Sequence, residues 1–336
     1  MGVVSGLTSF LKSGSARASP YAPMPAGAPS RQALPMTPQS QMPKARFDRA
    51  DIAVAVVLYH PSDSDLDNVT ELATWGVNVV AVVNAISETQ RRKLPSGPSV
   101  SGPGVSVIVN SSNLGLARAL NQAVGAAIDA GAHFVLMLDQ DSRPTVDMLD
   151  RLAGAAIAIE AKGRPLACVA PLLRDRKAVT DDKGETVDTV TGVTFATSGT
   201  MLTRRAWQEV GPMWEPLFID GIDHEWCFRA RAAGFETVLV PSAVMTHDMG
   251  EAAINVMGRF RPVHRSPVRH YFIVRNTLWL VGKRHIPIRW RLSELAKLAY
   301  RVPSYVVFST DKVRTARNIT AAIVDGVGRT SRRQPV

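Results

Sequence analysis

The segment Ile52-Ala-Val-Ala-Val-Val-Leu-Tyr59 is a continuous run of apolar and aromatic residues, half of them β-branched. Such a run predicts a strand that is buried on both faces, as in the middle of a parallel sheet. Shorter runs of the same kind follow at 77–83, 105–109, 134–138 and 166–171. Apolar residues at helical spacing predict helices between them, at 66–75, 115–130 and 146–161. This alternation predicts an α/β fold, with a mainly parallel sheet flanked by helices.

The charge of the chain is distributed unevenly. Its 336 residues carry 39 Lys and Arg against 29 Asp and Glu, a net charge of +10. Residues 1–50 hold six Lys or Arg and one acid, residues 258–336 hold 17 and three, and residues 51–257 therefore hold 16 and 25. A nucleic-acid-binding protein needs a continuous basic face, so an acidic middle between basic ends argues against a nucleic-acid partner.

Composition divides the chain into three parts. Residues 1–49 are rich in Pro, Ala and Ser, and we expect this segment to be disordered because it cannot form a core. Residues 50–257 contain the strand and helix pattern of a folded domain. Residues 258–336 are expected to form a basic, helical extension, with a helix over 292–308 that is broken at Pro303.

Two exclusions concern the cellular compartment. The sequence contains no run of 18 apolar residues, so no membrane-spanning helix is predicted. Cys168 and Cys227 are its two cysteines. They exclude a disulfide-rich scaffold and fit a protein of a reducing compartment.

Ligands of parallel sheets bind at the carboxyl ends of the strands, and the most informative strand end is Asp139-Gln-Asp141. Alternating residues place both carboxylates on one side of the chain, where they could hold Mg²⁺ or Mn²⁺. The alternative is ordinary turn chemistry, in which Asp ends a strand or caps a helix. The sequence has no GxGxxG after the first strand and no GxxxxGK[ST], which argues against a dinucleotide-binding oxidoreductase and a P-loop NTPase.

Two further segments open helices with polar residues. Asn113-Leu-Gly115 precedes Arg118, so the free N–H groups of this helix and the guanidinium could bind a phosphate, unless they form only a cap with an exposed arginine. At 218–229, Asp223 begins a second helix, whose dipole would keep a general base ionised. Glu225 could pair with Arg229 in that helix, and the acids there could equally serve only as caps.

The order of these motifs resembles that of the inverting family 2 glycosyltransferases of GT-A fold, and more narrowly that of bacterial rhamnosyltransferases that build O-antigen and related polysaccharides. The resemblance covers about residues 52–250, with a weaker match at Tyr271-Phe-Ile-Val-Arg-Asn276. It rests on the following motifs: Tyr59-His60-Pro61, Asn113-x-Gly115-x-Ala-x-Ala-x-Asn121, Asp139-Gln-Asp141-Ser142, Ser198-Gly199-Thr200, Phe218-Ile-Asp220-x-x-Asp223-x-Glu225-Trp226 and His247.

The resemblance implies roles for the matched residues. Asp141 and His247 would contact a divalent metal, Mg²⁺ or Mn²⁺, and Asp223 would be the catalytic base. Glu225 and Trp226 would lie on the acceptor side. The expected nucleotide-sugar-binding residues are Tyr59, Pro61, Asn84, Asn113, Gly115, Arg118, Asn121, Asp139, Ser198 and Gly199.

One position departs from the family pattern. After the second strand the family usually has an Asp that contacts the nucleotide base, whereas this chain has Asn84-Ala85. The Asn84 amide could still bind the base, but the carboxylate contact is lost. The identity of the base, and with it the sugar donor, is therefore left open.

The resemblance implies a metal-dependent inverting glycosyltransferase that moves L-rhamnose from dTDP-rhamnose onto a polysaccharide acceptor, which could be lipid-linked. The alternatives are a UDP-sugar donor, such as UDP-galactofuranose, and an inactive nucleotide-sugar-binding scaffold protein. Arg and aromatic residues alternate in 258–336, as at Arg289-Trp290-Arg291, which fits an anionic membrane surface or a basic helical cap on the catalytic domain. We expect a cytoplasmic protein, peripheral on the inner face of the bacterial cytoplasmic membrane.

Overall fold

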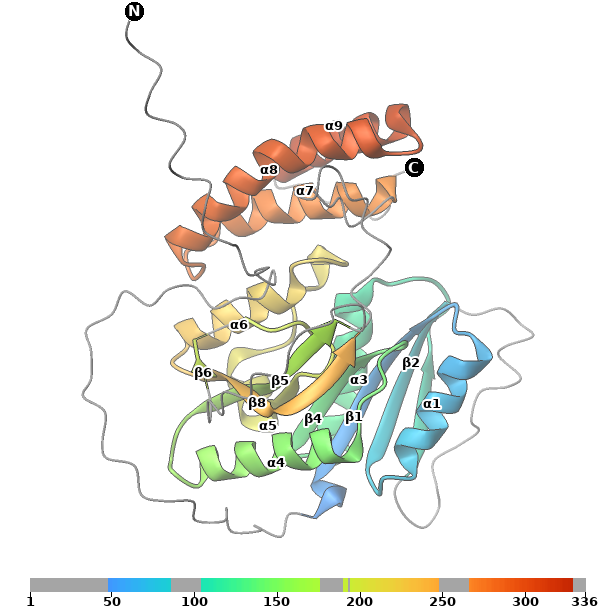
Figure 1. Cartoon of the computed structure of the whole chain (residues 1–336), viewed down its shortest axis with the longest axis vertical. Coiled ribbons are helices and arrows are strands. Elements are labelled where there is room, and N and C mark those ends of the chain that lie inside the picture. The colour runs from blue at the N-terminus through green and yellow to red at the C-terminus, as the bar shows by residue number, and fades with distance from the viewer. Residues whose placement is uncertain (1–47, 86–103, 176–189, 193, 248–265, 329–336) are drawn as a thin grey trace, which may run out of the picture. The chain divides into compact units, whose positions relative to one another are not determined.

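The computed structural model describes residues 48–85, 104–175, 190–192, 194–247 and 266–328 (Figure 1). The segment that was expected to be disordered, 1–49, lies outside the described residues except for its last two. Residues 41–336 belong to one compact unit. The expected boundary between 257 and 258 falls between described segments and stays a prediction.

The described residues form an eight-stranded sheet with the order β3-β2-β1-β4-β7-β5-β8-β6 (Figure 1). The strands are β1 (Ile52–Tyr59), β2 (Asn78–Ala85), β3 (Val105–Val109), β4 (Phe134–Asp139), β5 (Leu166–Asp175), β6 (Val190–Thr191), β7 (Met201–Thr203) and β8 (Glu236–His247). The pairs β1·β2, β1·β4, β2·β3 and β5·β8 are parallel. The predicted α/β fold with a mainly parallel sheet is therefore confirmed.

Strand β7 is one of the elements that the sequence pattern did not predict, as are β6 and the helix α5 (Arg204–Val210). Strand β7 has three residues and pairs antiparallel with both β4 and β5, so it joins the two parallel halves of the sheet. A run this short carries too little periodicity to be separated from a loop. Its position nevertheless matters, because Ser198-Gly199-Thr200 leads directly into it.

Helices cover both faces of the sheet (Figure 1). Residues of β1 alternate between two buried clusters, one with α1 (Asp63–Ala73) and α4 (Val146–Glu160), the other with α3 (Leu116–Asp129) and α6 (Ile222–Ala232). The second cluster also includes Ala206 of α5 (Arg204–Val210). Two short 3-10 turns, η1 (Arg49–Asp51) and η2 (Glu215–Leu217), complete this part.

The C-terminal extension is helical, as predicted. It consists of α7 (Pro267–Val281), α8 (Ile288–Phe308) and α9 (Lys312–Gly328). Helix α7 packs on α9, where the hydroxyl of Tyr271 donates to Asp325 Oδ2 at 2.7 Å and Trp279 Nε1 donates to the carbonyl of Asp325 at 3.2 Å. None of the helices in the described segments has both the length and the apolar character needed to cross a membrane.

The prediction of a break at Pro303 was wrong, because α8 runs through this residue to Phe308. Proline removes one helical hydrogen bond, to the carbonyl four residues earlier. Both Ala299 and Pro303 are exposed, so water can satisfy the carbonyl that proline leaves without a helical donor.

Candidate active site

The turn that follows β4 is joined to the turn that precedes β7. The backbone N–H of Asp139 donates to Ser198 Oγ at 3.2 Å, and the hydroxyls of Ser142 and Ser198 lie 2.5 Å apart in a buried position. Two of the motifs that carried the family resemblance are therefore brought together by direct hydrogen bonds between residues 56 and 59 positions apart in the chain.

Gly199 fixes how closely this second turn approaches the sheet. Its φ is +84°, and a Cβ at this position would lie 2.9 Å from both Met245 Cε of β8 and Pro171 Cγ of β5. A larger residue would need a backbone conformation that it rarely adopts and would also displace these neighbours. Ser198 and Gly199, which were predicted to bind the nucleotide-sugar, thus lie against the carboxyl ends of β4, β5 and β8.

The two carboxylates of the Asp139-Gln-Asp141 motif lie at the carboxyl end of β4. Asp139 is the last residue of β4 and is half-buried, whereas Asp141 is exposed in the turn. His247 is the last residue of β8, paired in register with Asp175; its side chain lies outside the described ones. Among the described side chains, no three or more His, Cys, Asp or Glu residues form a group that could hold a metal ion.

These residues fit a divalent cation of the Mg²⁺ type. Such an ion prefers oxygen ligands and is commonly held by one or two carboxylates, with substrate phosphates and water completing its shell. Asp139 and Asp141 supply two carboxylates, one half-buried and one exposed, at the carboxyl end of a parallel strand, where ligands of such sheets bind. Metal binding by Asp141 and His247 stays a prediction.

Gln140, between the two acids, connects the β4 turn to β1. Its Oε1 accepts a hydrogen bond of 2.7 Å from the backbone N–H of Tyr59. The residue Tyr59 is 49% exposed, and its ring contacts the ring of His60 edge-to-face, at 4.5 Å between centroids, while Pro61 is buried. Of the predicted nucleotide-pocket residues at this strand end, Tyr59 is thus the one whose ring is open to a ligand.

Asn84 organises a loop. Its Nδ2 donates to Asn113 Oδ1 at 2.8 Å, and its Oδ1 accepts from Asn110 Nδ2 and from the backbone N–H of Leu114, each at 3.0 Å. Asn113 Oδ1 also accepts from the N–H of Gly115 at 2.9 Å. The buried Asn84 amide therefore holds the start of α3, and its contact with a nucleotide base stays a prediction.

The start of α3 is joined to the segment that leads to Asp223. Gly115 has a φ of +87°, and a Cβ there would lie 2.5 Å from Phe218 Cδ2. The N–H of Ala117 donates to the carbonyl of Phe218 at 3.2 Å. One N–H group of this helix end is therefore bound within the protein, and phosphate binding here stays a prediction.

Two other predicted residues of α3 face the same segment. Asn121 pairs with the backbone of Met213, donating to its carbonyl and accepting from its N–H, both at 2.9 Å. Arg118 is exposed, with its Nε 3.9 Å from Glu215 Oε2. Asn121 thus has a structural role in this geometry, whereas the exposed Arg118 could reach a ligand.

Asp223 lies in the first turn of α6. It is the second residue of α6, half-buried, and its Oδ1 accepts from the N–H of His224 at 2.8 Å. Gly221 precedes the helix with a φ of +82°. The role of Asp223 as the general base stays a prediction.

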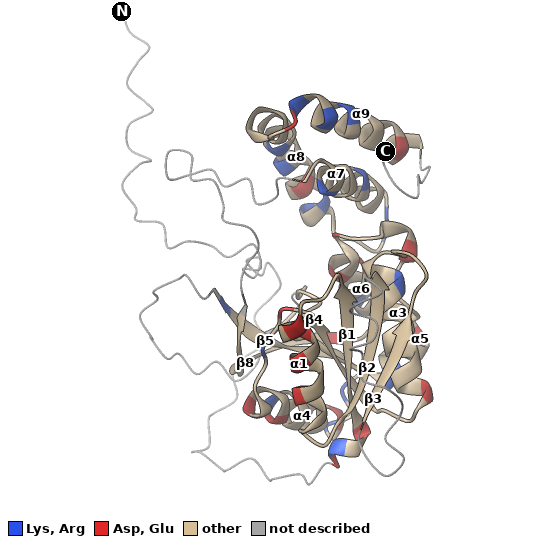
Figure 2. Cartoon of the chain, turned by 90° about the vertical axis from the view of Figure 1, so that its right-hand side faces the viewer, with Lys and Arg blue, Asp and Glu red and all other residues tan. Residues whose placement is uncertain are grey.

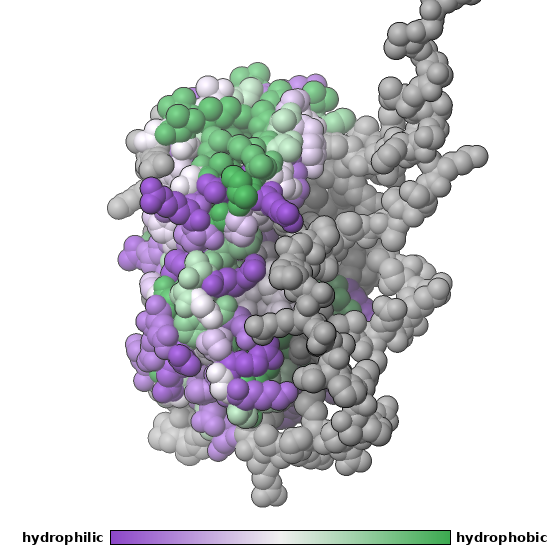
Figure 3. Space-filling view, turned by 90° about the vertical axis from the view of Figure 1, so that its left-hand side faces the viewer, coloured by the Kyte–Doolittle hydropathy of each residue, from purple (hydrophilic) through white to green (hydrophobic). Residues whose placement is uncertain are grey.

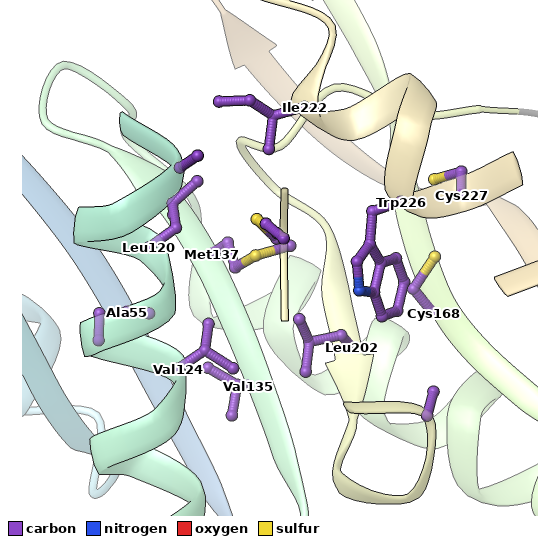
Figure 4. Close-up of a cluster of buried hydrophobic side chains, with 14 of the residues drawn as sticks. Ala55, Leu120, Val124, Val135, Met137, Cys168, Leu202, Ile222, Trp226 and Cys227 are labelled. Atoms are coloured by element: carbon purple, nitrogen blue, oxygen red, sulfur yellow. The ribbon is translucent and has the colours of Figure 1, made fainter. Parts of the chain in front are cut away.

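The predicted acceptor-side residues, Glu225 and Trp226, are buried. Glu225 forms two hydrogen bonds with Arg229, Nε–Oε1 and Nη2–Oε2, each 2.9 Å long. Trp226 donates to the carbonyl of Gly211 at 3.0 Å and packs in the hydrophobic cluster of Figure 4. This geometry favours structural roles for both, and an acceptor contact stays a prediction.

Cys168 and Cys227 lie in this same cluster as free, buried thiols (Figure 4). A hydrogen bond with Cys227, together with burial, raises the pKa of the Cys168 thiol well above its usual value. A thiol held in its protonated form is a poor nucleophile, so this pair belongs to the core and not to the site.

Residues of α7 were expected to belong to a membrane surface or to a basic cap on the catalytic domain, and Tyr271–Asn276 matched the family weakly, but no contact of a single residue was predicted. Arg269, Arg275 and Asn276 of this helix all hydrogen-bond to residues 216–220, the segment that leads to Asp223. The periodicity of the segment could have placed these residues in a helix. It could not show that the helix packs against a loop 50 residues earlier.

No protein-family model matches the chain. Among curated proteins it is 28% identical, over 293 residues, to the "dTDP-rhamnosyl transferase RfbF" of Shigella flexneri, an alignment that covers 83% of this chain and 96% of that protein. Among solved structures, the crystal structure of S. aureus TarS 1-349 aligns with 82% of this chain and 80% of that chain, at a TM-score of 0.48 and 14% identity. The predicted resemblance to bacterial rhamnosyltransferases is confirmed by the first of these similarities.

Proposed function

We propose that this protein transfers an L-rhamnosyl group from dTDP-rhamnose to a hydroxyl group of a glycan acceptor, with inversion at the anomeric carbon. The observation that carries the proposal is the alignment with a dTDP-rhamnosyl transferase over 96% of that protein. The same similarity confirms the prediction that the chain is an enzyme of the glycosyltransferase class. The hydrogen-bonded turns at Asp139–Ser142 and Ser198–Gly199 support the proposed transfer, because they bring two motifs of the family resemblance together.

The reaction is a single displacement. Asp223 removes the proton of the acceptor hydroxyl, the acceptor oxygen bonds to the anomeric carbon, and the bond from that carbon to the diphosphate oxygen breaks. The proton ends on the Asp223 carboxylate, and dTDP leaves with the electron pair. General base catalysis of this kind is ordinarily worth about 10²–10⁴ in rate.

The sugar donor would bind at the carboxyl ends of β1, β4 and β5. Asp141 and His247 would hold a divalent cation, which when bound would offset the charge of the departing diphosphate, and Asp139 would contact the nucleotide. The exposed ring of Tyr59 offers a face to the nucleotide base, and the turn at Ser198–Gly199 borders the sugar. Gln140 keeps Tyr59 and the acidic turn in a fixed relation.

A UDP-sugar is the competing donor, and one observation favours keeping it in the test. Asn84, at the position where related enzymes have a base-contacting Asp, is engaged with Asn110, Asn113 and Leu114. Base selection therefore depends on other groups at this edge, such as Tyr59. An inactive nucleotide-sugar-binding scaffold would bind the same donors without turnover.

The experiment combines binding and turnover. Thermal stability is measured with dTDP, UDP and GDP, each with Mn²⁺, Mg²⁺ or EDTA, and hydrolysis or transfer is followed with dTDP-rhamnose and UDP-galactofuranose. A nucleotide at about 100 times its Kd adds roughly 2.7 kcal/mol to the free energy of unfolding. A metal-dependent shift with dTDP, together with rhamnose transfer, supports the proposal. A shift with UDP alone redirects the sugar donor, and binding without turnover points to a scaffold.

The same proposal includes a membrane-bound acceptor, for which α9 supplies the support. Exposed apolar side chains lie along one side of this helix, with exposed fractions of 81% for Val313, 58% for Val324 and 72% for Val327. Exposed Lys312, Arg314 and Arg317 flank the first of them. Apolar residues beside cations are the pattern that binds the interface of anionic membranes.

The wider surface of the C-terminal helices has the same character. Lys and Arg are spread over α7, α8 and α9 (Figure 2), and hydrophobic residues gather at the end of the molecule that these helices form (Figure 3). Exposed apolar residues of α8 add to the surface: Ile288, Leu292, Leu295, Tyr300 and Val307. A lipid-linked acceptor would be met at such a surface.

A further inference from the structure

The segment 216–221, which precedes the base, has an unusual backbone. Phe218, Asp220 and Gly221 have φ values of +66°, +67° and +82°. For residues other than glycine, such a conformation costs about 1–3 kcal/mol each and persists only where the surroundings enforce it. The groups that enforce it here are found on α7.

Asn276 is the centre of these contacts. It is buried, and its Nδ2 lies within hydrogen-bond distance of three carbonyl oxygens, those of Leu217 (2.9 Å), Ile219 (2.7 Å) and Asp220 (2.8 Å). Its Oδ1 accepts from Nε and Nη2 of Arg275, at 3.0 and 2.7 Å. One amide therefore contacts three carbonyl groups within residues 217–220.

Arg275 supports Asn276 and reaches the same segment. Its Nη2 donates to the carbonyls of Pro216 (2.7 Å) and Leu217 (3.1 Å), although the residue is fully buried. The guanidinium lies over the rings of Tyr271, Phe272 and Trp279, at 5.3, 4.8 and 4.3 Å from their centroids. Burying a charge is costly unless the charged group has partners. These rings and carbonyls are the partners that offset this cost for Arg275.

Side-chain contacts between α7 and residues 216–221 also hold this segment in place. The ring of Phe218 stacks on that of Phe272 at 4.8 Å between centroids, and Arg269 Nη2 donates to Asp220 Oδ1 at 3.0 Å. A Cβ on Gly221 would lie 2.9 Å from Leu280 Cδ1. On its other side, the segment is fixed by the contact of Phe218 with the start of α3.

We propose that Arg275 and Asn276 are positioning residues, which set the place of Asp223 by holding 216–221 in its left-handed conformation. The proposal rests on the proposed function, because it takes Asp223 as the base. Gly221 caps the helix in which Asp223 is the second residue, so a shift of the segment moves the carboxylate. Neither residue touches the edge at Asp139 and Ser198 through any hydrogen bond described above.

The test compares Asn276→Ala with Leu278→Ala. Leu278 is in the same helix, but it packs on Gly326 of α9, so its truncation destabilises α7 without removing a bond to the segment. A misplacement of about 1 Å can cost 10²-fold in rate, so we expect kcat of Asn276→Ala to fall about 100-fold. In Asn276→Ala, KM for the sugar donor and the Kd for dTDP should stay within about twofold of the values of the unaltered protein. In Leu278→Ala, these two constants and kcat should all be unchanged.

A second readout does not depend on turnover. Hydrogen–deuterium exchange of the amides of 217–223 should become faster in Asn276→Ala than in Leu278→Ala at equal loss of Tm. Equal exchange or equal loss of kcat in the two variants overturns the proposal. If Asn276→Ala does not fold, Arg275→Lys is used, which keeps the charge but loses the paired Nε and Nη2 donors to Asn276 Oδ1, and the same comparison decides.

The two readouts separate this proposal from the proposed function. If the unaltered protein transfers no sugar with any donor, the proposed function fails, and the exchange data still decide whether Asn276 holds the segment. If the protein transfers rhamnose but Asn276→Ala retains kcat, the proposed function stands and the positioning role fails.

Discussion

Nε2 of His285 lies 3.2 Å from Oε1 of Glu225, the carboxylate that Arg229 holds through two hydrogen bonds. The turn between α7 and α8 is thereby joined to the helix that carries Asp223. Burial is the main cause that lowers the pKa of His285 below its ordinary value of 6.5; Glu225 opposes it, and Arg229 and Lys283 add to it.

This pKa predicts how stability depends on pH. Because the folded protein binds a proton at His285 less readily than the unfolded chain does, the contribution of this residue is complete above pH 6.5 and is lost as the pH falls through the folded-state pKa. Urea unfolding at a series of pH values should show that the free energy of unfolding falls as the pH is lowered below 6.5. This fall should be smaller in His285→Gln than in the unaltered protein. Identical pH profiles of the two proteins would contradict the prediction.

Asp223→Asn should abolish transfer and preserve nucleotide binding. The amide keeps the size of the side chain but accepts no proton, so the rate should fall by about 10²–10⁴. The measurement pairs turnover of the sugar donor with the thermal shift caused by dTDP and metal. Asp67→Asn, an exposed position of α1, is the matched control and should leave both unchanged. Retained turnover in Asp223→Asn would refute the assignment of the base.

Gly115→Ala should be strongly destabilising. The new Cβ would lie 2.5 Å from Phe218 at a φ of +87°, so the cost should be about 3 kcal/mol, measured by urea unfolding. Gly125→Ala is the control in the same helix, where a Cβ meets nothing within 4 Å. It should stabilise the protein by about 0.5–1 kcal/mol, because alanine is the better helix former. Equal effects of the two changes would show that the contact with Phe218 is not needed.

The membrane surface is tested with vesicles. The protein should sediment with phosphatidylglycerol vesicles more than with phosphatidylcholine vesicles, and added salt should weaken this binding. Replacing Val313 and Val327 by Ser removes apolar surface from α9 and should weaken binding about tenfold. Val109→Ser, at the edge of the sheet in β3, is the control and should bind as the unaltered protein does. Unchanged binding of the double variant would exclude α9 as the membrane surface.

Removal of metal gives a further test at Asp141. If this residue binds the cation, EDTA should abolish the thermal shift caused by dTDP, and Asp141→Asn should weaken the Mn²⁺ dependence of that shift at least tenfold. The control is Asp147→Asn, an exposed acid of α4 whose hydrogen bond with Arg151 lowers its pKa. A dTDP shift that persists in EDTA would contradict a metal-dependent donor site.

Periodicity predicted those parts of the fold that depend on local pattern. The bounds predicted for β1 and β3 match the structure, because a buried strand between turns is marked by its own composition. Strand β7 and the continuity of α8 through Pro303 were not predicted, since β7 is defined by its pairing with β4 and β5, and α8 continues where Ala299 and Pro303 are exposed to water. The local pattern of apolar and polar residues carries no information about strand pairing or about the solvent exposure of a helix.

The candidate site shows the same division. The family resemblance implied that Asp139 and Ser198 belong to one donor site, and a hydrogen bond joins the two residues. The predicted pairing of Glu225 with Arg229 is also present. The partners of Asn84 and Asn121 were not predicted, because a polar residue in a motif can face a ligand or its own protein, and the sequence is the same in both cases. Burial and bond partners distinguish the two.

The bonds from α7 have a consequence for the modularity of this chain. A chain that ended at residue 257 would keep every residue assigned to the sugar donor, the metal and the base, and would lose the partners of four backbone carbonyls, those of Pro216, Leu217, Ile219 and Asp220. The basic extension is therefore not an optional module added to a complete enzyme. Supplied as a separate polypeptide, it should act as the missing half of a split protein and restore order to the shortened chain.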